Sequence, residues 1–285
     1  MTFFSDRFSA LAPGYDVVLS DVWGVVHNGV SAFAEACDAL ARFRDGGGTV
    51  VLITNAPRPH DSVARQLDRF GVPHSVYDGI VSSGDVTRAV ILDRPGQSIL
   101  HVGPDRDKPI FEGLDLRFAP VESADYVVCS GLYDDETETP DDYRELLGVM
   151  RSRNLFMVCG NPDVVVERGD DLLYCAGAIA DAYRALGGEV LYAGKPYRPI
   201  YDQALSLAAR IRGTPSERAR VIAIGDSVRT DFRGASAYGI DCLFVTSGIH
   251  AAEFGGRDDP DPDAVEKILA ETGNRPRAIA RRLKW

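Results

Sequence analysis

The chain has 285 residues, enough for one large domain or two, and its 45% hydrophobic and 26% charged content is ordinary for a protein with a sizeable core. Its formal net charge of -11 argues against nucleic acid or an anionic membrane surface as a partner. The five cysteines show no C-x-x-C spacing, no signal-peptide core follows the first residue, and no apolar run approaches the roughly 20 residues of a membrane span, so we expect a cytoplasmic protein with reduced thiols.

The first chemical landmark is a short apolar run that ends on a carboxylate. Residues 17–19 are expected to form a buried strand that reaches Asp21, resumes at Val25–Val26 and folds back at Asn28–Gly29, a dipeptide favoured in tight hairpin turns. Open α/β sheets bind ligands at the carboxyl ends of their strands, where Asp21 would lie. An Asp that only caps a turn explains this residue equally well when it is considered alone.

Helix-like and strand-like segments then alternate along the chain, which is typical of a parallel sheet. The spacing predicts helices over residues 31–44, 59–70, 85–92, 141–150, 176–186, 199–211, near Asp231 and over 263–271, and strands over 49–53, 98–102, 126–129, 155–159, 221–224 and 242–245. The pattern pauses at residues 80–84 and returns after residue 194. We therefore expect an α/β core domain at residues 1–82 and 190–285, interrupted by a second α/β domain at residues 83–189.

Polar side chains follow four of the expected strands, and the ends of parallel strands open on one edge of a sheet. These residues are Asp21, Thr54 with Asn55, Lys195 just before a helix, and Asp226 with Asp231. Three carboxylates that meet would repel one another unless a cation joins them, and an oxygen-only ligand set suits Mg²⁺. A lysine can hold a phosphate oxygen as a point charge, so the set predicts a phosphoryl site in which Asp21 is a nucleophile that forms an aspartyl-phosphate.

Each of these residues also has a simpler interpretation. Lys195 alone is explained as a solvated lysine, Asp226 and Asp231 as helix caps, and Thr54–Asn55 as a turn. The occurrence of all the parts in this order favours the phosphoryl site.

The order Asp21, Thr54, Lys195 and Gly225-Asp-Ser-Val-Arg-Thr-Asp231 resembles the four motifs of the haloacid dehalogenase (HAD) superfamily. The long insertion between Thr54 and Lys195 resembles its subclass IIA, the NagD-like branch of nucleotide, sugar and 4-nitrophenyl phosphatases. Further matches cover most of the chain: Gly24-Val25, Ser83, Gly160-Asn161-Pro162-Asp163, Gly194-Lys195-Pro196 and Thr246-Ser247-Gly248.

The resemblance implies a Rossmann-like core, a mobile C2-type cap and a bound Mg²⁺. By position it makes Asp21 the nucleophile and a metal ligand and Asp226 a second ligand, with Asp231 supporting the metal site. It likewise makes Thr54 and Asn55 phosphate-binding and Lys195 charge-neutralising. Asn161 and Asp163, on a turn of the cap, are candidates for facing the substrate, and a purely structural turn is the equal alternative.

One position departs from the resemblance. Phosphatases of this family carry a second Asp two residues after the nucleophile, which protonates the leaving oxygen and later activates water. Here the residue is Trp23, whose side chain offers only an indole N–H donor, although its backbone carbonyl can still bind the metal. Acid–base help typically contributes about 10²–10⁴-fold, so we expect a leaving group that departs readily as an anion, such as a carboxylate or an aryl oxide.

His27, on the same expected hairpin, is the nearest titratable residue that could replace the missing proton donor. The alternative is that His27 only lines the pocket or hydrogen-bonds the hairpin.

Three functions are consistent with these residues. The first, which the sequence favours, is a Mg²⁺-dependent phosphohydrolase for a small phosphorylated substrate, with an activity that Trp23 would weaken. The second is a binding protein whose degenerate site holds a phosphorylated ligand, and the third is another enzyme on the same scaffold, such as a phosphotransferase. Substrate identity and oligomeric state stay open, with a homo-oligomer among the alternatives.

Overall fold

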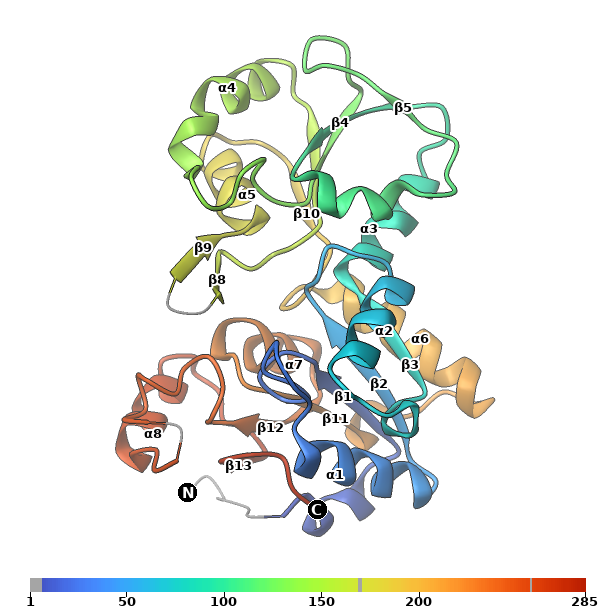
Figure 1. Cartoon of the computed structure of the whole chain (residues 1–285), viewed down its shortest axis with the longest axis vertical. Helices are drawn as coiled ribbons and strands as arrows, with labels where there is room; N and C mark the ends of the chain where they lie inside the picture. Colours follow the sequence, from blue (N-terminus) through green and yellow to red (C-terminus); the bar gives the residue numbers. More distant parts are fainter. Residues whose placement is uncertain (1–6, 169–170, 257) are drawn as a thin grey trace. The chain divides into compact units, whose positions relative to one another are not determined.

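The computed structural model describes residues 7–168, 171–256 and 258–285. They form two compact units, which we call the core unit and the cap unit (Figure 1). The core unit holds the described residues up to Thr54, Ala64–Val81 and Tyr201–Trp285, and the cap unit holds Asn55–Val63 and Ser82–Ile200. The sequence-derived boundaries of the two domains stay a prediction. Among the described residues, no helix has both the length and the apolar character that a membrane crossing demands.

A parallel six-stranded sheet forms the centre of the core unit, in the order β13-β12-β11-β1-β2-β3. The bounds are β1 Val17–Asp21, β2 Thr49–Thr54, β3 Gly79–Ser82, β11 Val221–Gly225, β12 Asp241–Val245 and β13 Ala278–Ala280. Every residue of β1, β2 and β11 is buried, as expected for a parallel sheet with both faces covered. Because β1 lies between β11 and β2, the end of β1 is flanked by the ends of both neighbours.

Helices follow most of these strands, as the sequence predicts. Their bounds are α1 Ala34–Asp45, α2 His60–Arg69, α6 Arg198–Arg212, α7 Arg233–Tyr238 and α8 Pro262–Ala270, with a π-helical turn η7 at Val228–Phe232 and 3₁₀ turns at Phe8–Ala10, Ala12–Gly14, His74–Val76 and Arg218–Arg220. The alternation of strands and helices therefore builds the predicted α/β core.

The cap unit has its own parallel sheet, in the order β10-β7-β6-β4-β5, and a separate antiparallel pair, β8 and β9. The strands are β4 Ser98–Val102, β5 Arg117–Phe118, β6 Tyr126–Cys129, β7 Phe156–Cys159, β8 Val165–Arg168, β9 Asp171–Tyr174 and β10 Val190–Tyr192. The helices are α3 Ser83–Leu92, α4 Arg144–Ser152 and α5 Ala176–Ala185, with 3₁₀ turns η4 Asp105–Phe111 and η5 Pro140–Tyr143. The predicted fold class, a parallel-sheet core with an inserted α/β cap, is confirmed.

The predicted strand at Val25–Val26 is wrong. After β1 the backbone of Gly24 takes a positive φ of 82°, which ends the extended conformation, and the amides of Val26 and His27 both turn back to the carbonyl of Val22. The turn at Asn28–Gly29 does form, with Gly29 at φ 86°, but it joins single bridges rather than two strands.

Candidate active site

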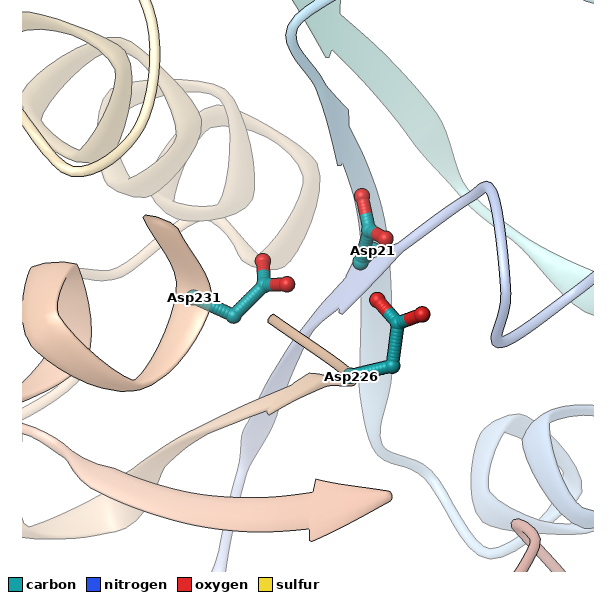
Figure 2. A group of neighbouring side chains, drawn as sticks. All are labelled: Asp21, Asp226 and Asp231. Carbon is teal, nitrogen blue, oxygen red and sulfur yellow. The ribbon is translucent and has the colours of Figure 1, made fainter. Parts of the chain in front are cut away.

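Three carboxylates from separate stretches of the core unit converge at the carboxyl edge of its sheet. Asp21 ends β1, Asp226 directly follows β11, and Asp231 lies in the turn η7. Figure 2 shows the three carboxyl groups facing a common space. One ligand oxygen from each lies within 4.8 Å of the others, and the side chains are only 7%, 4% and 2% exposed. The structure thus brings together the acids that the sequence singled out.

Asp226 is held by backbone that approaches it closely. The N–H of Ile249 donates to its Oδ2 at 2.8 Å. A Cβ atom added at Gly24 or at Gly248 would overlap that same oxygen. Glycine is therefore needed on both sides of this carboxylate, which explains the glycines near Asp21 and after β12.

Asp231 is fixed by the turn that carries it. The N–H of Ser227 donates to Asp231 Oδ2 at 3.2 Å, and the N–H of Asp231 donates back to the carbonyl of Ser227 at 3.1 Å. The Ser227 hydroxyl accepts the N–H of Thr230 at 3.3 Å and so caps the turn. Asp231 also packs on Gly225, where a Cβ would overlap its side chain.

The donor set of this cluster fits a divalent cation. Three buried carboxylates at this separation repel one another, and burial removes the water that would screen them. Oxygen-only ligands of this kind suit Mg²⁺, and Ca²⁺ takes the same ligand type. Asp21, Asp226 and Asp231 are therefore the residues that would hold the metal.

The remaining predicted residues fall into two groups, one in each unit. Thr54, at the end of β2, lies in the core unit one strand away from Asp21. Asn55, Asn161, Asp163 and Lys195 all belong to the cap unit.

The side chain of Asn55 connects three parts of the cap unit. Its Oδ1 accepts the N–H of Lys195 at 2.7 Å, and its Nδ2 donates to the carbonyl of Lys195 at 3.0 Å and to Asp163 Oδ1 at 2.9 Å. Asn161 Oδ1 accepts the N–H of Asp163 at 3.1 Å. Lys195 is only 2% exposed, and both its N–H and its carbonyl are thus held by the side chain of Asn55. A Cβ at Gly194 would overlap Asn55 Oδ1, so the tight clamp requires glycine there.

Trp23 and His27 form one packed unit beside Asp21. The indole lies against Gly29, where a Cβ would overlap the ring, and it remains 50% exposed. The ring of His27 packs edge-on against Trp23, with centroids 5.3 Å apart, and lies 4.7 Å from Phe70. Its Nδ1 accepts the N–H of Gly29 at 2.9 Å. Burial lowers the pKa of His27 to about 4, so the imidazole is neutral near pH 7.

Sequence reasoning missed His250, which lies near the acid cluster. Its Nε2 accepts the N–H of Val228, the first residue of η7, at 3.2 Å. No motif signalled this residue, because its partners are the backbone amide of Val228 and the side chain of Glu253 rather than the acid cluster itself.

Comparisons with known proteins find two matching families. Residues 18–117 match the family described as haloacid dehalogenase-like hydrolase, and residues 192–272 match the one described as HAD-hydrolase-like.

Individual relatives match most of the chain. A solved hydrolase of the haloacid dehalogenase-like family from Brucella suis is 47% identical, with a TM-score of 0.85, over 98% of this chain and 100% of that one. A 5'-nucleotidase of Bacillus subtilis is 25% identical over 90% of this chain and 97% of its own length. A glycerol phosphate phosphatase of Mycobacterium tuberculosis, solved with calcium, is 26% identical, with a TM-score of 0.65, over 85% of this chain and 69% of that one.

Proposed function

This chain belongs to the haloacid dehalogenase-like hydrolases of subclass IIA, and from that membership we propose that it hydrolyses a small phosphorylated metabolite with Asp21 as the nucleophile. The observation that carries the proposal is the buried cluster of Asp21, Asp226 and Asp231 at the carboxyl edge of the core sheet. Proteins similar to it include a 5'-nucleotidase and a glycerol phosphate phosphatase, which supports a small phosphorylated metabolite as the substrate.

The chain's own residues divide the chemistry between them. Asp21 attacks phosphorus through a carboxylate oxygen, the bond from phosphorus to the leaving oxygen breaks, and the electron pair departs with that oxygen. Water then cleaves the aspartyl-phosphate, which releases phosphate and restores Asp21. Thr54 and Asn55 bind phosphate oxygens, and Lys195 neutralises their charge. When bound, Mg²⁺ offsets the charge of the carboxylates and the phosphoryl group. Asp21 and Asp226 would hold this ion, with Asp231 in support and the Trp23 carbonyl as a further ligand.

We assign Asn161 and Asp163 to the substrate-facing side of the cap. Asp163 bonds to the same Asn55 that holds Lys195, so the turn carrying both residues is tied to the phosphate-binding group.

Trp23 narrows the choice of leaving group. An indole cannot deliver the proton that an alkyl oxide needs on departure, so the proposed substrates of highest turnover are acyl and aryl phosphates. The neutral, buried His27, with Nδ1 already accepting a hydrogen bond, supports a positioning role beneath Trp23 and weakens the proton-donor hypothesis. Unchanged turnover in His27→Ala would end that hypothesis.

Trp23 also supports a second candidate function. With Trp23 in place of an acid, the site would bind a phosphorylated ligand through Thr54, Asn55 and Lys195 without turning it over. The third alternative, another reaction on the same scaffold, has no separate support in the cluster of acids.

Phosphate release from aryl and acyl phosphates, measured with Mg²⁺ and with a chelator, tests the proposal. We expect turnover that needs the metal and that falls at least about 10³-fold in Asp21→Asn, because the nucleophile is lost. Asp38→Asn, which changes an exposed acid on α1, is the matched control and keeps the wild-type rate. Tight ligand binding without release of phosphate from any acyl phosphate would instead establish the binding protein.

A further inference from the structure

A short segment after β12, residues 248–253, contacts both acid-bearing stretches that follow β11. Gly248 packs on the carboxylate of Asp226, and the N–H of Ile249 donates to Asp226 Oδ2 at 2.8 Å. The next residue, His250, reaches the turn η7, which carries Asp231. The segment therefore hydrogen-bonds directly to Asp226 and, through Val228, to the turn that carries Asp231.

The contact between His250 and η7 satisfies a donor that the turn leaves open. The first N–H groups of a helical turn have no partner within the turn, and Val228 is buried, so water does not replace one. His250 Nε2 accepts this N–H at 3.2 Å. A π-helical turn is less regular than an α-helix, which makes external support of its first residue more important.

The protonation state of His250 follows from its two partners. An amide N–H only donates, so Nε2 must be the unprotonated nitrogen of the ring. Nδ1 then carries the hydrogen and donates it to Glu253 Oε1, 2.8 Å away. Glu253 thereby selects the tautomer that can accept from Val228, and Phe254 packs against the ring with centroids 5.9 Å apart.

We propose that His250, oriented by Glu253, is a positioning residue that fixes the turn carrying Asp231 and so sets the affinity of the three-acid cluster for a divalent cation. The proposal rests on the proposed function, since it takes the cluster as a metal site. His250 is not a metal ligand in this proposal; it acts through the backbone of Val228.

Three variants of His250 separate its two hydrogen bonds. Gln places an amide oxygen near the position of Nε2 and keeps the bond to Val228. Asn reaches only the position of Nδ1, so it keeps a donor for Glu253 and loses Val228. Leu loses both bonds.

The experiment measures Mg²⁺ and Mn²⁺ binding to the purified full-length chain by calorimetry, with thermal unfolding in chelator as the check of folding. Removing groups that orient metal ligands typically costs about 10–100-fold in affinity, and we expect a Kd increase of this size in His250→Asn and His250→Leu. His250→Gln should stay within about threefold of wild type. If His250→Leu fails to fold, the pair of Asn and Gln variants decides the question.

The outcomes distinguish this inference from the function on which it rests. A wild-type chain that binds neither metal overturns the proposed metal site and the inference with it. Wild-type binding that is unchanged in the Asn variant, or equally weakened in the Gln and Asn variants, overturns the inference alone.

Discussion

At the scale of single residues, the indole of Trp23 packs against two neighbouring residues. It covers the backbone of Gly29, and its ring meets the imidazole of His27 at an interplanar angle of 73°; that imidazole in turn accepts the N–H of Gly29. The side chain at position 23 is therefore held in one place beside Asp21, although half of it is exposed. In the proposed reaction, a side chain of this kind would act on the leaving group by shape and contact rather than by proton transfer.

Replacing Trp23 by Asp should increase turnover of alkyl phosphates by roughly 10²-fold, because a carboxylic acid beside the nucleophile can protonate the leaving oxygen. Turnover of acyl phosphates, which leave without a proton, should change much less. Steady-state kinetics on one substrate of each kind measures the difference. Trp23→Asn is the matched control, since it removes the ring without adding an acid; an Asp variant that folds and gains nothing over Asn contradicts our interpretation of this position.

At the scale of secondary structure, the strands that sequence reasoning found are those built from continuous apolar runs, such as β2, β4 and β11. The missed strands have at most four residues each and lack the four consecutive apolar residues of β6 and β7, which were found; they are β3, β5, β8, β9, β10 and β13. The strand expected at Val25–Val26 fails for another reason, since the positive φ of Gly24 overrides the propensity of the two valines.

The candidate site likewise has features that the sequence predicts and features that it does not. Acids at strand ends were predictable because parallel strands share an edge, and Asp21, Asp226 and Asp231 do meet. The clamp of Asn55 on the backbone of Lys195 was not predictable, because no local pattern shows hydrogen bonds between residues 140 positions apart.

The cap unit also contains a cluster of polar side chains near its sheet, formed by Ser130, His101 and Asp107. Ser130, after β6, hydrogen-bonds to His101 on β4 with 3.0 Å between Nε2 and Oγ, and to Asp107 in η4. Burial raises the pKa of Asp107 from 3.8 to about 6. Folding therefore takes up a proton between about pH 4 and 6, and the stability that this uptake contributes is lost as the pH rises through 6.

Replacing Asp107 by Asn should stabilise the protein at pH 7.5 by up to about 3 kcal/mol, since two pKa units correspond to that free energy and Asn carries no charge to bury. At pH 4, where Asp107 is protonated in the folded state, the two proteins should be nearly equal. Urea unfolding at both pH values measures this. Asp115→Asn, which changes an exposed acid of the cap, serves as control. If Asp107→Asn changed the free energy of unfolding equally at the two pH values, burial of a charged Asp107 would not destabilise the protein at neutral pH.

At the scale of the whole molecule, a metal held by the acid cluster would make the stability of the core depend on that metal. Without a cation the three carboxylates repel one another, so removing one charge should relieve strain; with a cation the same change removes a ligand.

We expect Asp226→Asn to be more stable than wild type in chelator and less stable in excess Mg²⁺. Binding adds RT ln(1 + [Mg²⁺]/Kd) to the free energy of unfolding, about 2.7 kcal/mol at a hundredfold excess over Kd, and the variant should lose most of this. Thermal unfolding of both proteins in the two buffers shows whether the order reverses. An order that is the same in both buffers would argue against a metal at this cluster.

The packing of the indole on Gly29 also has a consequence for how the sequences of relatives vary. Because no side chain fits beneath the ring, positions 23 and 29 are expected to change together. Lineages that keep tryptophan at the first should keep glycine at the second, whereas in those that carry a small acid there the second is restricted only by its positive φ, which asparagine also tolerates. The pair would then serve as a marker that separates, among relatives, those that share this protein's choice of leaving group.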